Sequence, residues 1–272
     1  MNPIRFTKMS GSGNDFIIID NRVNKFNEMD LPDFVKKVCT RRLSVGADGI
    51  IIIEEDHEVD FKWRFFNADG SIAEMCGNGA RCAARFAVNN GIAKEELRFR
   101  TIAGIINAWV KGEKVQIEIG VPNGTALDQT ILIDDKKYPF HFVNTGVPHV
   151  VIFLDSISDI DLEKIGKAIR FHQIFQPEGT NVNFAQVIDR DSIKIRTYER
   201  GVEAETLACG TGASAVAFIA NLKYGLKPPI KIVTKGGILE VDFSPGGKNP
   251  PIFLTGDARF IYTGELHPEA LI

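Results

Sequence analysis

The sequence lacks the features that mark several large classes of protein. The longest aliphatic run in the 272 residues, Ile50–Ile53, is far too short to span a bilayer, and the N-terminal stretch has no apolar core of a secretory signal. Positive charge is not in excess either, because the net charge is -3 and the pI is about 6.0. We therefore expect a cytoplasmic protein that binds neither nucleic acid nor a membrane.

Cysteine is also scarce. The four cysteines, Cys39, Cys76, Cys82 and Cys209, do not suggest a disulfide scaffold in a compartment that keeps thiols reduced. No C-x-x-C or H-x-x-x-H spacing accompanies them, so we expect no metal site. A lone cysteine is most often a small buried apolar residue, and this is the expectation for Cys39 and Cys82.

The sequence does contain a long internal repeat. The stretches IAEMCGNGARCA, residues 72–83, and ETLACGTGASA, residues 205–215, share Cys-Gly-x-Gly-Ala, and an offset of 133 residues separates Cys76 from Cys209. The same offset relates four further pairs: Gly13 and Gly146, Gly46 and Gly179, Thr101 and Thr234, and Gly104 and Gly237. A repeat of this length predicts two similar structural units.

Both halves predict the same order of elements. Runs rich in Val, Ile and Phe precede each cysteine and predict strands. An apolar helix follows each one and ends near Gly91 or Gly225. Because a helix that is apolar on most faces is buried, we predict an α/β (mixed α+β) fold of two pseudo-symmetric domains, each a curved, barrel-like mixed or antiparallel sheet around a central helix. The predicted domains are residues 1–122 with the tail 263–272, and residues 123–262, connected through a polar segment at 120–138.

The position of the repeated cysteines suggests a chemistry. The first N–H groups of a helix are unpaired and carry partial positive charge, which favours an anion and lowers a thiol pKa. Gly77 and Gly210 leave space for a ligand beside the backbone. If the halves face one another, one thiolate could remove a proton from a carbon while the other thiol returns one to its opposite side. This favours a racemase or epimerase in which two helix N-termini, rather than a pyridoxal cofactor, stabilise the charge on the substrate carboxylate.

Five stretches then identify a family that this sequence resembles. They are GSGNDF (11–16), FNADGSIAEMCGNGARC (66–82), TIAG (101–104), PEGTNVNF (177–184) and YERGVEAETLACGTGASA (198–215). In this order, over nearly the whole chain, they resemble diaminopimelate epimerase. The resemblance implies a homodimer without a cofactor that interconverts LL- and meso-2,6-diaminopimelate, in the lysine and peptidoglycan pathways, by means of two cysteines.

The resemblance also implies roles for individual residues. Cys76 and Cys209 resemble the acid/base pair, with His149 and Glu199 in support. The groups that resemble the holders of the reacting carboxylate are Gly77, Asn78, Gly210 and Thr211. Further substrate contacts are implied for Asn14, Asn67, Asn181, Glu199 and Arg200, and a dimer contact for Tyr262. The guanidinium of Arg200 suits a distal carboxylate, because it can bind one through two parallel hydrogen bonds.

One position departs from the family pattern. The family commonly has Gly-Asn-Pro-His where this chain has GVPH, residues 146–149, so Val147 replaces an asparagine that often contacts substrate. The internal repeat agrees, because Val147 corresponds to Asn14. A site that lacks one polar partner discriminates less sharply between analogues, but the other polar positions match, so diaminopimelate stays the expected substrate.

Three other functions stay open from the sequence. A racemase of proline, histidine or another amino acid would keep both cysteines and change the distal groups. A redox protein would cycle Cys76 and Cys209 between dithiol and disulfide. A binding protein would use the helix N-termini only to hold a carboxylate. The remaining histidines, His57, His141, His172 and His267, have no matching partners and are expected on the surface or in loops.

Overall fold

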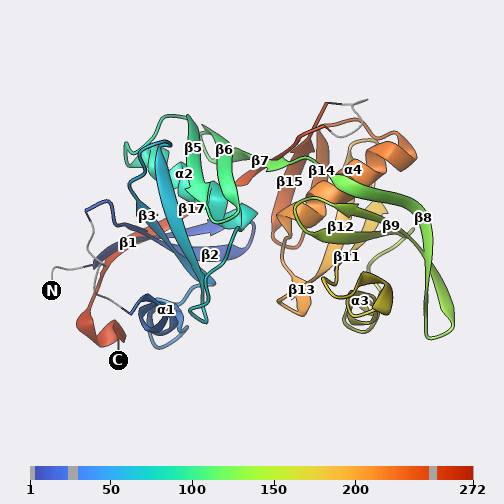
Figure 1. Cartoon of the computed structure of the whole chain (residues 1–272), viewed down its shortest axis with the longest axis horizontal. Coiled ribbons are helices and arrows are strands. Elements are labelled where there is room, and N and C mark those ends of the chain that lie inside the picture. Colours follow the sequence, from blue (N-terminus) through green and yellow to red (C-terminus); the bar gives the residue numbers. More distant parts are fainter. Residues whose placement is uncertain (1–3, 24–29, 245–249, 272) are drawn as a thin grey trace. The chain divides into compact units, whose positions relative to one another are not determined.

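The structure is a computed structural model that describes residues 4–23, 30–244 and 250–271. The chain forms two compact units (Figure 1): Met1–Ile117 with Gly256–Ile272, and Glu118–Thr255. These limits differ by a few residues from the predicted domains. The C-terminal segment joins the first unit earlier than predicted, because β17 (Arg259–Leu266) pairs antiparallel with β1 (Ile4–Gly11) along its whole length.

The first unit is built on a mixed sheet. In the order in which they pair, its strands are β17, β1, β2 (Asn14–Asp20), β3 (Gly49–Glu54), β4 (Phe61–Asn67), β5 (Glu96–Thr101), β6 (Gly104–Lys111) and β7 (Lys114–Gly120). The pairs β2–β3 and β4–β5 are parallel and the others are antiparallel. The 3-10 helix η2 (Pro268–Leu271) ends this unit.

Both faces of the central strands of this unit are covered by helices. Ile17 and Ile19 of β2 belong to the buried cluster that also contains the apolar side of α1 (Leu31–Cys39). On the opposite face, α2 (Gly77–Asn89) packs on β1, β2, β3 and β6. Strands buried on both faces need continuous apolar runs, which explains Ile50–Ile53 without any membrane segment. None of the helices in the described ranges is long and apolar enough to cross a membrane.

The second unit repeats this arrangement. In pairing order its strands are β8 (Asn123–Ile133), β9 (Lys136–Asn144), β10 (Pro148–Phe153), β11 (Asn181–Val187), β12 (Ser192–Glu199), β14 (Ile230–Thr234), β15 (Gly237–Asp242) and β16 (Ile252–Asp257). The short β13 (Ala204–Thr206) pairs beside β12. The 3-10 helix η1 (Gln173–Phe175) follows α3 (Leu162–Arg170), and both lie before β11. As Figure 1 shows, α3 and α4 (Gly210–Tyr224) lie on opposite sides of this sheet.

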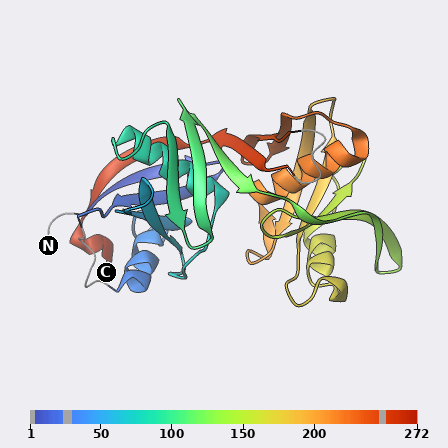
Figure 2. The ribbon, with the colours of Figure 1, turned by 45° about the horizontal axis from the view of Figure 1, so that its top comes forward.

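The segment predicted as a polar connection is a strand instead. Residues 123–133 form β8, which pairs with β9 in the long ribbon visible in Figure 2. The sequence was misleading because most side chains of β8 are exposed, and only Ile131 and Ile133 are buried.

The expectation that His141 lies on the surface or in a loop was wrong. His141 is buried in β9 and accepts a hydrogen bond at Nδ1 from the backbone N–H of Asp128 at 3.1 Å.

The two central helices confirm the predicted fold. In α4, nine consecutive residues from Gly212 to Ala220 are buried, and in α2 the buried residues include Cys82. Helix α4 ends at Gly225, whose φ of 69° lies in the left-handed region, and α2 ends at Asn90, just before Gly91 with a φ of 65°. Cys39 and Cys82 are buried as expected, and burial raises the pKa of each thiol to about 12.

Candidate active site

The two repeated cysteines hold the same structural position. Cys76 is the N-cap residue of α2 and Cys209 that of α4, both in extended conformation, and neither side chain makes a capping hydrogen bond. The carbonyl of Cys76 accepts from Ala80 N–H at 2.8 Å, and that of Cys209 from Ala213 N–H at 2.9 Å. N-cap positions usually hold Ser, Thr, Asp or Asn, whose oxygens bond to the first turn. A thiol here leaves the positive end of the helix to act on the sulfur and on any anion beside it.

In the first unit, polar side chains form a chain beside the start of α2. The amide of Asn78 donates to Oδ1 of Asn14 at 2.6 Å, and the amide of Asn14 donates to Asp48 at 2.9 Å. Asp48 is held in turn by Arg41 at 2.9 Å. The structure thus brings the predicted residues Asn14 and Asn78 together. The side chain of Asn67 makes a different bond, since its amide donates to the hydroxyl of Ser71 at 3.0 Å, although its backbone lies beside Gly49.

Among the residues of this group that the sequence did not point to, Arg81 is the most buried. Its guanidinium is fully buried and donates to Oδ1 of Asn78 and to the hydroxyl of Ser12, both at 2.8 Å. It also donates to the carbonyl of Gly77 at 3.2 Å and to that of Asp257 at 3.4 Å. An arginine one turn inside a helix normally reaches the surface, so the sequence offered no signal beyond its place in the repeated motif.

In the second unit, a threonine stands where the first unit has Asn78. The hydroxyl of Thr211 lies 3.5 Å from Sγ of Cys209, and the carbonyl of Thr211 accepts from the hydroxyl of Thr145 at 2.9 Å. Val147, which corresponds to Asn14, has no polar side chain to offer Thr211. The Asn14–Asn78 pair of the first unit thus has no equivalent in the second.

His149 is held as a neutral imidazole with a defined tautomer. The side-chain nitrogen of Asn183 donates to the carbonyl of Val150 at 3.0 Å, which fixes the orientation of this amide because a carbonyl only accepts. The same nitrogen lies 3.1 Å from Nδ1 of His149, so Nδ1 is the acceptor and the proton resides on Nε2. Burial lowers the pKa of His149 to about 3, with a smaller contribution from the charge of Arg200.

Nε2 of His149 is buried and has no hydrogen-bond partner among the residues that the structure describes. As an N–H group it can donate to a bound molecule or to a reacting atom. Asn183, which sets this tautomer, was not anticipated. The sequence does not reveal which residue of the neighbouring strand lies beside a given side chain.

Asn181, Glu199 and Arg200 meet where β11 and β12 lie side by side. Oδ1 of Asn181 accepts from the backbone N–H of Arg200 at 2.9 Å, and its amide donates to the carbonyl of Pro148 at 3.0 Å. The guanidinium of Arg200 donates to the carbonyl of Glu178 at 2.8 Å. Burial raises the pKa of Glu199, and the hydroxyl of Thr206 partly opposes this shift. The carboxyl of Glu199 therefore favours its protonated form more than a surface glutamate does.

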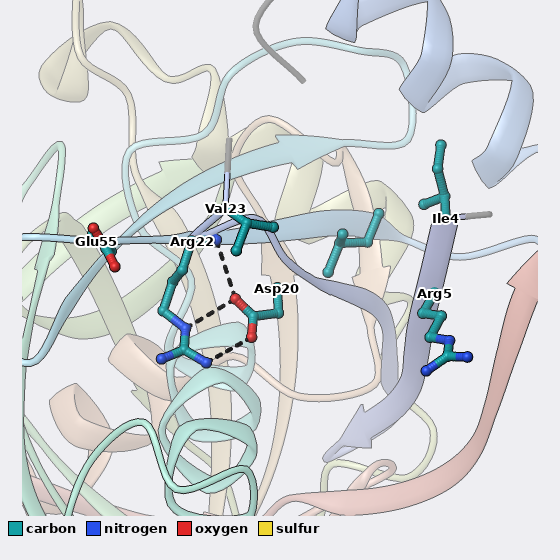
Figure 3. A pocket seen from close by; sticks show the side chains of 7 residues that line it. Ile4, Arg5, Asp20, Arg22, Val23 and Glu55 are labelled. Atoms are coloured by element: carbon teal, nitrogen blue, oxygen red, sulfur yellow. Dashed lines mark hydrogen bonds and ion pairs between the residues drawn. The ribbon is translucent and has the colours of Figure 1, made fainter. Parts of the chain in front are cut away.

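A hollow in the first unit contains none of these residues. It measures about 380 Å³ and is lined by Ile4, Arg5, Ile19, Asp20, Arg22, Val23 and Glu55. Figure 3 shows that two of its charged groups are engaged with each other, since Arg22 donates to the two oxygens of Asp20 at 3.0 and 2.8 Å. Nothing in it resembles the helix starts. Within the described part of the chain, no three His, Cys, Asp or Glu side chains are placed to hold a metal ion.

Solved structures show the class of fold to which this arrangement belongs. A probable proline racemase from Agrobacterium radiobacter K84 with bound carbonate has a TM-score of 0.70 and 16% identity, covering 98% of this chain and 95% of that chain. A PhzF-family phenazine biosynthesis protein from Bacillus anthracis has a TM-score of 0.73 and 15% identity, covering 98% and 100%. The chain therefore has the two-unit fold of proline racemase and PhzF proteins.

Sequence comparison defines the family. The family model described as diaminopimelate epimerase matches residues 6–125 and 141–261. The diaminopimelate epimerase of Aquifex aeolicus (strain VF5) is 47% identical, over 98% of this chain and 99% of that protein. That of Archaeoglobus fulgidus is 44% identical, over 97% and 96%. The chain belongs to the diaminopimelate epimerase family and is an amino-acid isomerase.

Proposed function

We propose that this protein interconverts LL- and meso-2,6-diaminopimelate by two proton transfers, one from the substrate to a cysteine and one from a second cysteine to the substrate. The observation that carries the proposal is the pair of N-cap cysteines, Cys76 and Cys209, each at the positive end of a buried helix. The names of the 47% and 44% identical relatives supply the substrate. The activity then belongs to lysine and peptidoglycan precursor synthesis.

The proposed reaction consists of two proton transfers. The thiolate of one cysteine takes the proton from the α-carbon, and the electron pair of the C–H bond moves toward the carboxylate. The thiol of the other cysteine then gives a proton to the opposite face of the carbon, which inverts the stereocentre. The first cysteine ends as a thiol that holds the proton taken from the substrate, and the second ends as a thiolate, so no oxidant, reductant or leaving group takes part.

The increase of charge on the carboxylate is the difficult part of this reaction. Backbone N–H groups that follow Cys76 and Cys209 at Gly77, Asn78, Gly210 and Thr211 are oriented before the substrate arrives, which is the arrangement that stabilises developing charge most strongly. We propose that these groups make a pyridoxal cofactor unnecessary. The reverse transfer uses the same groups, so the enzyme works in both directions.

The remaining predicted residues would bind and orient the substrate. Arg200 offers a guanidinium to the distal carboxylate, while Asn14, Asn67 and Asn181 offer amides. His149, neutral and protonated at Nε2, acts as a hydrogen-bond donor rather than as a cation. Glu199, with its raised pKa, lies on the same strand end as Arg200 and supports the thiol chemistry near the substrate ammonium.

The experiment is proton NMR of the protein with LL-diaminopimelate in deuterium oxide, with reductant and without pyridoxal phosphate. We expect exchange of the α-proton and appearance of the meso isomer, and loss of both in Cys76→Ala and Cys209→Ala. Proline, histidine and lysine serve as control substrates. Exchange of proline or histidine alone would support a racemase of another amino acid, and absence of any exchange would contradict the acid/base roles.

We further propose a cytoplasmic homodimer. Thiols that act as acid and base require a reducing compartment, which supports the cytoplasm. Strand β17 pairs on one side with β1, and the side chains of Ile261 and Tyr262 are about half exposed. Such a strand, with apolar residues directed to solvent, is a typical surface for a second copy of the chain.

A further inference from the structure

Arg81 carries a charge that hydrogen bonding alone does not explain. Its guanidinium is fully buried at the start of α2, and in the described part of the chain no carboxylate lies within ion-pair distance. Its acceptors are the carbonyls of Gly77 and Asp257, the amide oxygen of Asn78 and the hydroxyl of Ser12. Burying a cation without an ion partner is costly, so a neutral residue would be preferred unless the charge has a use.

The nearest carboxylate is already matched by another cation. The side chain of Asp257 pairs with Arg259 at 2.6 Å and accepts a 3.4 Å bond from Ser12, which stands between it and Arg81. Arg85, one turn further along α2, donates to the carbonyl of Ala258 and lies 5.1 Å from the ring centre of Phe260. Arg81 and Arg85 therefore lie on the first turns of α2, and the carboxylate of Asp257 is paired with a third guanidinium, that of Arg259.

The other ionisable groups in this region do not change the balance. Cys82 on α2 is neutral because burial raises the pKa of its thiol to about 12. The strands that pack against α2 carry further charged groups, namely Arg5, Lys8, Asp15, Asp20, Glu54 and Lys111. Lys8 pairs with Asp15, and Arg5, Asp20 and Glu54 pair with groups outside these strands. Glu74, two residues before Cys76, is exposed to solvent, whereas Arg81 is fully buried.

The second unit shows that the helix start does not need this charge. Ser214 stands where the offset of 133 places the counterpart of Arg81, and its hydroxyl donates to the carbonyl of Gly210 at 3.0 Å. This is the same acceptor, four residues earlier in the helix, that Arg81 uses at Gly77. Arg85 is likewise replaced by Phe218. The local hydrogen bond is retained in both units, whereas the charge is present in only one.

We propose that Arg81 is a positioning residue whose buried positive charge favours the thiolate form of Cys76, so that the resting enzyme holds a thiolate at Cys76 and a thiol at Cys209. The assignment of both cysteines to the reaction rests on the function proposed above. Electrostatics agree with the geometry: burial lowers the pKa of Arg81, and any negative charge on Cys82, Cys76 or Asp257 acts in the opposite direction. The interaction between Arg81 and Cys76 is mutual, so each favours the ionised form of the other.

The test is the pH dependence of alkylation by iodoacetamide, measured for each cysteine by mass spectrometry of its peptide. Because only the thiolate reacts, the midpoint of each rate profile reports its ionisation. In the unmodified protein, we expect the midpoint of Cys76 to lie below that of Cys209. The opposite order would overturn the proposal without any mutation.

Variants of Arg81 separate the effect of its positive charge from the effect of its hydrogen bonds. In Arg81→Met we expect the midpoint of Cys76 to rise by about one pH unit or more, which slows its alkylation at neutral pH about tenfold. Arg81→Lys keeps the charge but not the bonds to Asn78 and Ser12, and its Cys76 midpoint should stay near the original. Cys209 in the same samples is the internal control, and Ser214→Ala, at the matching place in the second unit, should move neither midpoint.

The outcomes distinguish this proposal from the proposed function. Alkylation does not require turnover, so a shifted Cys76 midpoint without epimerisation would support the role of Arg81 and count against the reaction. If epimerisation occurs, Arg81→Met should lower kcat more than it changes KM, and the acid limb of its pH profile should move to higher pH. A folded Arg81→Met protein with unchanged Cys76 ionisation would contradict the proposal.

Discussion

The side-chain amide of Asn183 donates to Nδ1 of His149 at 3.1 Å while it also donates to the carbonyl of Val150 at 3.0 Å. A hydroxyl hydrogen bond of 2.9 Å from Thr197 to Oδ1 completes the fixation of this amide. All three side chains are buried, so none can reorient without leaving a polar group unpaired. His149 is thereby fixed as a donor through Nε2 over the whole neutral range of pH.

Nitrogen-15 NMR of histidine-labelled protein tests this directly. We expect His149 to show a protonated Nε2 and an unprotonated Nδ1, unchanged from pH 8 to pH 5, because its pKa is lowered to about 3. In Asn183→Asp, a carboxylate beside Nδ1 should raise the pKa of His149 and move a proton to Nδ1. A wild-type His149 that gains a proton near pH 6.5 would contradict the prediction.

The same shift predicts how acid affects stability. The ordinary pKa of 6.5 applies to the unfolded chain, and the folded pKa is about 3, so the unfolded state binds a proton that the folded state excludes. This contribution to stability is complete above pH 6.5 and is lost as the pH falls toward 3. His149→Gln should therefore flatten the decline in melting temperature between pH 6.5 and pH 4 relative to the wild type.

Restoring the missing polar group at residue 147 should sharpen substrate binding. In Val147→Asn, the new amide stands beside Thr211 as Asn14 stands beside Asn78. One added hydrogen bond is worth about 0.5–1.5 kcal/mol, so we expect KM for diaminopimelate to fall about two- to tenfold with little change in kcat.

Asn14→Val is the matched comparison. Its effect on KM should be larger and in the opposite direction, because it leaves Asn78 and Asp48 without a partner that they now have. Steady-state kinetics of both variants provide the measurement, and an unchanged KM in Val147→Asn would show that residue 147 does not contact substrate.

The fold was predictable from the sequence because the repeat and the apolar runs reflect burial directly. The two cysteines were also predictable, since the motif around each marks a helix start. Arg81 and Asn183 were not, because their roles depend on tertiary partners such as Ser12 and His149 that are distant in sequence. Strand β8 was missed because its sequence carries little signal of burial. Its pairing with β9 buries so few side chains that its composition resembles that of a connecting loop.

Native thiol chemistry should distinguish two kinds of cysteine. Cys39 and Cys82 are buried with a pKa of about 12, so at pH 8 they should resist iodoacetamide until the protein unfolds. If the two thiols flank one carbon as proposed above, mild oxidation should inactivate the enzyme by forming a Cys76–Cys209 disulfide, and dithiothreitol should restore activity. Peptide mapping identifies the bond. Full activity in a sample that contains this disulfide would contradict the roles proposed for both thiols.

The homodimer proposal gives a prediction for Tyr262. Its ring packs edge-on against Phe6 at 5.9 Å between ring centres, yet about half of the residue is exposed. Tyr262→Ala should shift analytical ultracentrifugation from dimer to monomer at micromolar concentration. Tyr224, exposed to a similar degree on α4, provides a matched control, and Tyr224→Ala should leave the assembly unchanged. A monomeric wild-type protein would refute the assembly itself.

The equivalent glycines of the two helix starts should differ in their tolerance of alanine. A Cβ at Gly212 would lie 2.4 Å from Oδ1 of Asn183, whereas the nearest atom to a Cβ at Gly79 would be the end of the Ile51 side chain at 3.2 Å. Asn183 is held by three partners and cannot yield, so Gly212→Ala should destabilise the protein by roughly 1–3 kcal/mol, typical of overpacking. In Gly79→Ala, alanine stabilises the helix by about 1 kcal/mol relative to glycine, which offsets most of the weaker clash with Ile51. Urea unfolding measures the stability of both variants. The amide that Gly212→Ala displaces is the one that sets the tautomer of His149. Gly212→Ala should therefore also alter the His149 NMR signals, whereas Gly79→Ala should leave them unchanged.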